Sequence, residues 1–239
     1  MKYIYGPLQS RRLGNSLGIN LTPFKICTFD CIYCQLGKTT VKTRERKEYL
    51  APGEIIVELK TWLEHNPEDL KKLDYISLSG SGEPTLNISI DKLIKEIKEI
   101  CQVPIAVITN ASLFSDASVR STLAAADLIV PSLDTVVSTA FEKIDRPEGS
   151  IKIEEIIVGL ISLRKEFRGK IWLEVMLVSG INDDLRYIKK LKEVVDEINP
   201  DKIQLNSPVR STAELNIKPP SKEKMNKIKE ILGDKAEII

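Results

Sequence analysis

The chain has 239 residues, of which 42% are hydrophobic and 29% charged, with a formal net charge of +1. This predicts one sizeable core and a single domain over 1–239, with a basic segment and cysteine loop at 1–50 and a barrel core at 51–239. No apolar run approaches the roughly 20 residues that cross a bilayer, and the first residues lack an apolar signal region. We therefore expect a soluble, cytoplasmic protein with no membrane partner.

The first 48 residues are more basic than the rest of the chain. They contain nine lysines and arginines, including Arg11 and Arg12, against three acidic residues. A basic region near a reaction site favours a negatively charged partner such as RNA, a nucleotide or a carboxylate. A solvated arm, with charges that offset an anionic metal centre, explains the same excess equally well.

Apolar, β-rich runs alternate with stretches of helical spacing, which predicts an α/β fold with a mostly parallel sheet. Strands are predicted at 16–21, 75–79, 104–108, 128–132, 171–178 and 202–206. Helices, marked by apolar residues that recur on one face, are predicted at 52–65, 91–100, 153–167, 184–198 and 221–232. A complete eight-unit barrel needs about 250 residues, so these six units predict a partial, open (β/α)6 TIM-like barrel.

Three cysteines, Cys27, Cys31 and Cys34, form a CxxxCxxC triplet with no fourth ligand nearby. Thiolates select zinc or iron–sulfur clusters, and a closed structural site takes four protein ligands. The only histidine, His65, and the only other cysteine, Cys101, lie far along the chain. A tetrahedral zinc site would therefore require the fold to bring one of them next to the triplet. The spacing favours a 4Fe–4S cluster with one open coordination position.

The cysteine loop resembles that of the radical S-adenosylmethionine (SAM) superfamily, in which an aromatic residue precedes the third cysteine, as Tyr33 does here. Three further segments, SGSGEPT, VITNAS and VPSLDT, follow in the order that the superfamily shows. The resemblance implies a partial barrel and a 4Fe–4S cluster whose unligated iron binds the amino and carboxylate groups of SAM. It also implies that Tyr33 packs near the adenine.

A glycine-containing turn follows the strand predicted at 75–79. Two glycines alone indicate only a tight turn, and the third glycine of a dinucleotide-binding fingerprint is missing. The turn resembles the GGE motif of the superfamily, with a serine at its first glycine, which implies that its backbone and an ionised glutamate hold the SAM ammonium. The residues concerned are Gly80, Ser81, Gly82, Glu83 and Pro84.

Polar residues also follow the next two predicted strands. Thr109 and Asn110 follow the strand at 104–108, and Ser132 and Asp134 lie at the end of the strand at 128–132. Such residues often cap the helices that come after them. By analogy with the superfamily they contact the ribose and carboxylate of SAM, and a capping residue can do both.

Five residues are candidates for binding the substrate. Glu174 interrupts an apolar strand, and a carboxylate inside a barrel is costly unless paired, so it is either a site residue or a salt-bridge partner. Arg210, after the last predicted strand, is either a clamp for a carboxylate or phosphate or an ordinary surface arginine. The other candidates are Arg11, Arg12 and Asn206. The sequence assigns no residue a catalytic role beyond SAM cleavage.

Several segments, among them YGPLQSRRLGNSLGINLTPF, FEKIDRP, MLVSGIND and QLNSPVR, resemble a subgroup of wyosine-synthetase-related iron–sulfur oxidoreductases. Members that make the tricyclic wyosine base of tRNA hold a second cluster with additional cysteines. Only Cys101 remains here, so that reaction is not expected.

The resemblance implies an enzyme that cleaves SAM to a 5′-deoxyadenosyl radical, which abstracts hydrogen from a substrate. The basic first segment favours an RNA base or nucleotide, and a ferredoxin or flavodoxin is the expected low-potential electron donor. A small metabolite is an alternative substrate. Another alternative is an enzyme that activates a glycine residue in a partner protein. Another is a non-catalytic iron–sulfur electron carrier. A single histidine leaves little for serine–histidine hydrolysis.

Overall fold

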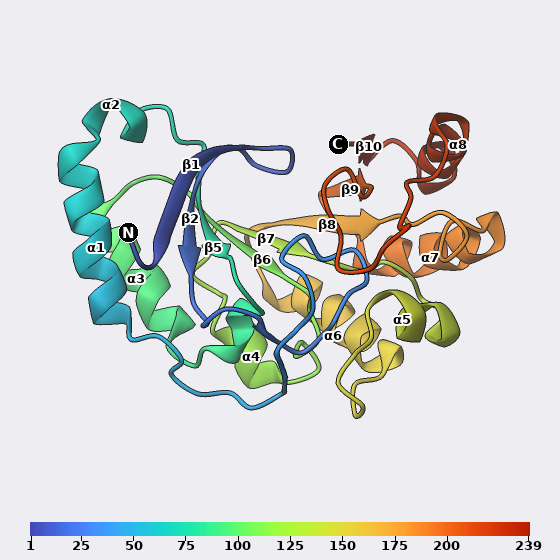
Figure 1. Cartoon of the computed structure of the whole chain (residues 1–239), viewed down its shortest axis with the longest axis horizontal. Coiled ribbons are helices and arrows are strands. Elements are labelled where there is room, and N and C mark those ends of the chain that lie inside the picture. Colours follow the sequence, from blue (N-terminus) through green and yellow to red (C-terminus); the bar gives the residue numbers. More distant parts are fainter.

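A computed structural model describes all 239 residues, and its main feature is one open sheet of eight strands (Figure 1). The strands are β1 (Ile4–Ser10), β2 (Gly14–Asn20), β3 (Ile26–Cys27), β4 (Val41–Lys42), β5 (Tyr75–Ser79), β6 (Ile105–Thr109), β7 (Leu128–Pro131), β8 (Lys170–Met176), β9 (Lys202–Asn206) and β10 (Ala236–Ile238). The sheet order is β1-β2-β5-β6-β7-β8-β9-β10, and β3 and β4 form a separate ribbon.

The sheet is parallel from β2 to β10, and only β1 pairs antiparallel, with β2. Because β1 and β10 stand at opposite ends of the order, hydrogen bonds do not close the barrel. The predicted partial α/β barrel is confirmed, and all six predicted strands are present. The sequence did not predict β1, β10 or the β3–β4 ribbon.

The helices are α1 (Pro52–His65), α2 (Pro67–Leu70), α3 (Ile90–Ile100), α4 (Ala117–Ser121), α5 (Ser138–Ile144), α6 (Ile153–Glu166), α7 (Leu185–Ile198) and α8 (Lys222–Leu232), with a 3-10 turn η1 (Pro84–Leu86). The five predicted helices are present. The short helices α2, α4 and α5 were not predicted, because four, five and seven residues give little room for a helical repeat. None of the helices has both the length and the apolar composition that a membrane crossing requires.

The core lies between the sheet and the helices that cover its outer side (Figure 1). Leu17 and Ile19 of β2 share an apolar cluster with Leu59 of α1 and Ile94 of α3, and all four are fully buried. Helix α1 begins with a proline at its first position, where no hydrogen-bonded N–H is required. This packing fixes the strands, so their carboxyl ends form a rigid rim for the loops that follow.

Candidate functional site

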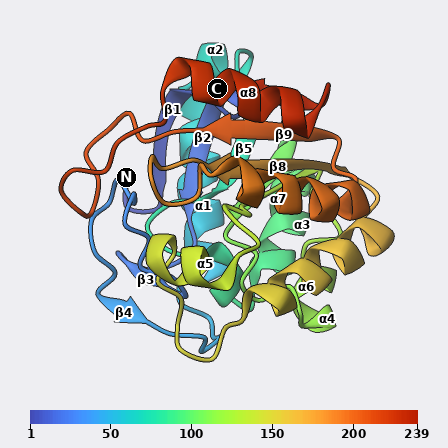
Figure 2. The ribbon, with the colours of Figure 1, turned by 90° about the vertical axis from the view of Figure 1, so that its right-hand side faces the viewer.

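The cysteine loop lies over the carboxyl ends of the parallel strands, next to the end of α5. Asp30 of this loop donates its N–H to the carbonyl of Asp145 at 3.0 Å. Figure 2 shows the β3–β4 ribbon, which flanks the loop, beside α5. Functional groups of barrel-like α/β folds gather at this end of the strands. The loop therefore brings the three cysteines to the edge where the predicted polar residues also lie.

Each of the three thiols has a different polar neighbour. The amide of Asn110 lies 3.6 Å from the Cys27 sulfur, and the Lys25 ammonium lies 3.1 Å from the Cys34 sulfur. The Cys31 thiol points to the carboxyl group of Asp145, at 3.5 Å.

All four cysteines are free thiols, and Cys101 lies apart from the loop, at the end of α3. No three histidine, cysteine, aspartate or glutamate side chains converge as ligands of a single metal ion. Cys27, Cys31 and Cys34 each retain some exposed surface.

Burial, followed by the charge of Glu83, raises the pKa of the Cys27 thiol to about 12. Burial and the charge of Asp145 also raise the pKa of Cys31 well above its usual value. Without metal these two thiols therefore keep their protons at neutral pH. Coordination to iron removes the proton of a thiol outright, so metal binding at this loop would release protons.

The turn after β5 holds the segment that leads into Cys27. Ser81 accepts a hydrogen bond at its carbonyl from the N–H of Lys25 at 2.7 Å, and Glu83 donates its N–H to the carbonyl of Ile26 at 3.1 Å. A Cβ on Gly82 would lie 1.8 Å from that carbonyl oxygen, so only glycine permits the approach. Gly80 has a φ of +105°, which also favours glycine.

Glu83 is buried and accepts four hydrogen bonds from its own neighbourhood. Its Oε1 accepts from the Thr109 hydroxyl at 2.6 Å and from the N–H and hydroxyl of Thr85, while its Oε2 accepts from the N–H of Asn110 at 2.8 Å. Burial raises the pKa of Glu83, and these donors oppose the rise. Glu83 and Thr109, both predicted to bind SAM, thus tie the turn to the end of β6.

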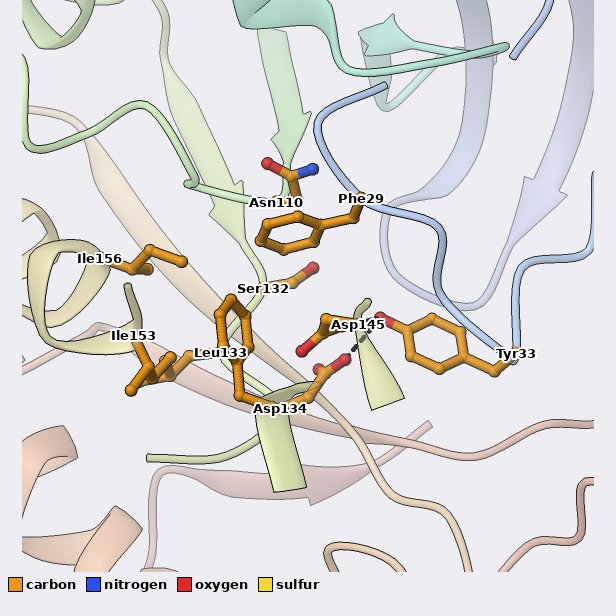
Figure 3. A pocket seen from close by; sticks show the side chains of 10 residues that line it. Phe29, Tyr33, Asn110, Ser132, Leu133, Asp134, Asp145, Ile153 and Ile156 are labelled. Atoms are coloured by element: carbon orange, nitrogen blue, oxygen red, sulfur yellow. Dashed lines mark hydrogen bonds between the residues drawn. The ribbon is translucent and has the colours of Figure 1, made fainter. Parts of the chain in front are cut away.

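A small cavity of about 10 Å³, roughly the space of one water molecule, lies beside the cysteine loop (Figure 3). Four of the predicted SAM contacts line it: Tyr33, Asn110, Ser132 and Asp134. The other lining residues are Phe29, Leu133, Phe141, Asp145, Ile153 and Ile156. The five residues of the turn after β5 are not in this lining and lie beside the approach to Cys27.

Two acidic side chains meet the hydroxyl of Tyr33 at this cavity (Figure 3). Tyr33 donates to Asp134 at 2.5 Å and lies 3.4 Å from Asp145. Asp134 also accepts the N–H of Met176 of β8 at 2.8 Å. Burial raises the pKa of Asp134 to about 7, and burial with the charge of Asp134 raises that of Asp145 well above its usual value. The arrangement can hold a proton near neutral pH.

Three of the predicted substrate residues form one hydrogen-bonded network. Arg12 meets Glu174 through two hydrogen bonds of 2.7 Å, and Asn206 donates its amide to the same carboxylate at 2.6 Å. Glu174 is 3% exposed, so the network explains how its charge is tolerated. Both readings of Glu174, salt-bridge partner and site residue, are compatible with this position.

The two remaining arginines lie outside that network. Arg11 donates to the carbonyl of Ile239 at 3.3 Å, and Arg210 donates to the side chain of Gln35 in the cysteine loop at 2.9 Å. Burial, followed by the charges of Arg12 and Arg210, lowers the pKa of Arg11. The segment 207–221, which carries Arg210, also contacts the cysteine loop where the N–H of Glu214 donates to the carbonyl of Ile32 at 3.0 Å.

Among the residues that the fold brings to the site, Lys25, Phe29 and Asp145 were not predicted as site residues from the sequence. The segment FEKIDRP contains Asp145 and pointed to a family resemblance, yet no residue in it was selected. Lys25 precedes the first cysteine by two positions, and in the structure its side chain is buried. In the sequence, its positive charge next to the cysteine triplet was the one signal that it belongs to the site.

The sequence is similar to several known proteins. The model of the radical SAM superfamily matches residues 21–192. The UPF0026 protein MJ1312 of Methanocaldococcus jannaschii is 37% identical over 98% of this chain and 72% of that protein. A protein named GTPase Obg from Brachyspira hyodysenteriae is 42% identical over 95% of this chain, which spans only 33% of that protein. A protein of a Thermotoga strain, named as the dual-specificity RNA methyltransferase RlmN, is 28% identical over 89% of this chain and 61% of its own length.

Solved structures share the fold at lower sequence identity. A radical SAM methyltransferase from Sphaerobacter thermophilus superposes with a TM-score of 0.72, at 18% identity, over 94% of this chain and 65% of that one. Archaeal TYW1 superposes with a TM-score of 0.58, at 17% identity, over 92% of this chain and 72% of that one. The family match covers well over half of the chain and includes all three cysteines of the triplet. The chain therefore belongs to the radical SAM superfamily, whose enzymes use a 4Fe–4S cluster and S-adenosylmethionine.

Proposed function

We propose that residues 1–239 act as a single radical SAM domain that holds one 4Fe–4S cluster through Cys27, Cys31 and Cys34 and acts on an RNA base or nucleotide. When bound, the cluster supplies the electron that cleaves SAM to the 5′-deoxyadenosyl radical, which abstracts hydrogen from the substrate. The observation that carries the proposal is the position of three thiols, without a fourth, beside a cavity at the strand ends that four of the predicted SAM contacts line.

The surroundings of the sulfur atoms suit an anionic iron–sulfur site. An ammonium from Lys25 and an amide from Asn110 are directed at two of the sulfurs, and donors of this kind stabilise metal-bound thiolates. The four-ligand zinc alternative gains no support, because Cys101 lies before β6, at the end of the strands opposite to the loop. The donor set therefore fits three-cysteine ligation.

SAM would bind over the small cavity beside the loop, and the side chains that line this cavity would move apart to admit the ligand. Tyr33 offers a flat ring whose hydroxyl is fixed by Asp134, and Asn110 and Ser132 offer polar groups to the ribose and carboxylate. The turn at residues 80–84 supplies backbone groups near the approach to Cys27, and the Oε2 of Glu83 accepts only one hydrogen bond, from the N–H of Asn110. An acceptor site therefore remains on Glu83 for the SAM ammonium. Thr109 would hold this carboxylate in place through its hydrogen bond to Oε1.

The substrate would enter over the network of Arg12, Glu174 and Asn206. Arg11 and Arg210, which lie near it, add positive charge at this side of the barrel, as a phosphate-bearing substrate requires. The similarity to proteins named as RNA methyltransferases supports an RNA substrate over a small metabolite. Only Cys101 remains for a second cluster, so a wyosine-type reaction gains no support.

The electron must come from outside the chain, and a ferredoxin or flavodoxin has the required low potential. The proposed cluster needs three reduced thiols, and a reducing compartment keeps thiols in that state. This requirement supports a cytoplasmic location. The cluster would serve catalysis, not electron transport alone, since an electron carrier has no use for the polar side chains of Asn110, Ser132 and Asp134 that line the cavity beside it. The alternative substrate, a glycine residue in a partner protein, is tested by the turnover experiment described below.

Anaerobic reconstitution tests the proposal. The protein should bind four irons per chain, change its EPR spectrum when SAM is added to the reduced form, and release 5′-deoxyadenosine with dithionite. Deuterated RNA should then pass deuterium into 5′-deoxyadenosine. A spectrum indifferent to SAM and no 5′-deoxyadenosine would overturn the enzyme assignment. Turnover with a glycine-containing partner, and none with RNA, would overturn the substrate class.

A further inference from the structure

Lys25 is a buried lysine with no carboxylate partner. It is 3% exposed, and none of the ion pairs within 4.0 Å includes it. The one side-chain hydrogen bond of its ammonium goes to the sulfur of Cys34, at 3.1 Å. Burying an ammonium without a counter-charge is costly, so this placement calls for an anion that the protein side chains do not supply.

The backbone holds Lys25 firmly in this position. Its N–H donates to the carbonyl of Ser81, and its own carbonyl accepts from the N–H groups of Thr40 and Val41 at 3.1 and 3.2 Å. Its φ of +56° lies in the left-handed region, where a non-glycine residue is kept only by its surroundings. The side chain is thus directed at Cys34 by a segment that is fixed on both sides.

The other two ligand sulfurs lack a comparable neighbour. Cys27 faces a neutral amide and Cys31 faces a carboxyl group, so Lys25 is the one charged donor that reaches a sulfur of the triplet. A cluster that gains an electron becomes more negative, and a nearby positive charge that donates to its sulfur stabilises the reduced form more than the oxidised form.

We propose that Lys25 is a positioning residue that raises the reduction potential of the iron–sulfur cluster through its hydrogen bond to Cys34. The inference rests on the proposed function, since it assumes that Cys34 is a cluster ligand. The step it affects is the transfer of one electron from the external donor to the cluster. No proton moves, because the ammonium only donates a hydrogen bond. The consequence is a cluster that a cellular donor reduces more readily.

The experiment compares wild-type protein with Lys25→Met, which removes the charge and the donor, and Lys25→Gln, which removes the charge and keeps a neutral donor. Both side chains are unbranched, so they tolerate the left-handed backbone as well as lysine does. Lys38→Met is the matched control, because Lys38 lies in the same loop but is exposed and paired with Glu214. Each protein is reconstituted anaerobically, assayed for iron and sulfide, and titrated with dithionite while EPR reports the reduced cluster.

We expect Lys25→Met to shift the ratio of reduced to oxidised cluster at least tenfold toward the oxidised form, which is about 59 mV for one electron. Lys25→Gln should give a smaller shift in the same direction, and Lys38→Met none. An unchanged potential in a Lys25→Met protein that holds its cluster overturns the proposal. So does a loss of SAM affinity at constant potential, which would make Lys25 a ligand of the SAM carboxylate.

Two further results separate this proposal from the proposed function. Wild-type protein that binds no iron would end the function and leave Lys25 without a cluster to act on. Variants that fold, as circular dichroism can show, but hold no iron would make Lys25 an assembly residue and overturn its role in the potential. If only Lys25→Met fails to hold iron, the reduction potential of Lys25→Gln tests the proposal instead. A potential equal to that of the wild type would then overturn it.

Discussion

Arg12 and Glu174 are joined by two hydrogen bonds of 2.7 Å, from Nε and one terminal nitrogen of the arginine to the two carboxylate oxygens. Arg12 lies in the turn between β1 and β2, whereas Glu174 lies on β8, near the other end of the sheet order. Gln204 of β9 also donates its amide to the carbonyl of Arg12, at 3.0 Å. The hairpin thus bridges the open side of the barrel by side chains, where no strand pairing closes it (Figure 1).

Breaking this ion pair should destabilise the protein. Arg12→Met leaves the buried carboxylate without its counter-charge, and Glu174→Gln leaves the guanidinium without one. We expect each to lower the free energy of unfolding by about 3 kcal/mol, and the double variant to lose less than the sum of the two. Urea unfolding of the metal-free protein measures this. Strictly additive losses would show that the two side chains do not act as a pair.

The three cysteines of the triplet should be individually necessary for iron. Replacing Cys27, Cys31 or Cys34 by alanine removes one of only three anchors, and we expect near-complete loss of bound iron and sulfide after anaerobic reconstitution. Cys101→Ala is the matched control and should keep the wild-type content, because Cys101 is buried at the end of α3. Full iron content in a triplet variant, or loss of iron in the control, would contradict three-cysteine ligation.

Asp134 should make the stability of the metal-free protein depend on pH. Burial raises its pKa to about 7, against about 3.9 in an unfolded chain, so the folded state binds this proton more tightly. The burial penalty is absent below pH 4 and grows as the pH rises to 7, so stability should fall across that window. The charged or titratable groups that face it are Tyr33, Asp145, Glu174 and Arg12.

Asp134→Asn should therefore flatten the decline in unfolding free energy between about pH 5 and 7, the upper part of the window set by these values. Some slope remains, because the pKa of Asp145 is raised as well. Asp184→Asn is the control, since hydrogen bonds from Arg186 lower the pKa of Asp184 to about 2, below the window. An Asp134→Asn protein with the wild-type slope would show that Asp134 does not titrate there.

The parallel strands and long helices were predictable because each carries a clear apolar pattern. All residues of β7 are buried, for example, and its sequence is a short apolar run. Strand β1 was missed because its residues show neither an apolar run nor a regular alternation of apolar and polar residues. In addition, Gly6 and Pro7 indicate a turn. Strand β10 has three residues, too few to show any periodicity.

The position of the cysteine triplet and of several cavity residues was also predictable, since motifs place them at strand ends. The contacts between them were not, because they join residues far apart in the chain. Arg12 and Glu174 were selected separately, 162 positions apart, and no spacing rule pairs them. The four donors that surround Glu83 come from two segments, so its part in holding the turn could be seen only in three dimensions.

Gly82 should be required for both folding and metal binding. A methyl group at this position would lie 1.8 Å from the carbonyl oxygen of Ile26 and 2.6 Å from the hydroxyl of Thr22, so Gly82→Ala must push the chain that leads into Cys27 away from the turn. We expect a loss of about 1–3 kcal/mol in unfolding free energy, as for other overpacked sites, together with reduced iron content.

Gly53→Ala is the matched control for this change. Gly53 lies in the first turn of α1, and an added Cβ there meets no atom within 4 Å. Alanine also favours the helix, so this variant should be as stable as the wild type or slightly more so. Urea unfolding and iron content measured on both proteins decide the matter. If Gly82→Ala matched Gly53→Ala in both, the turn after β5 could shift freely, and it would not be what holds Cys27 in place.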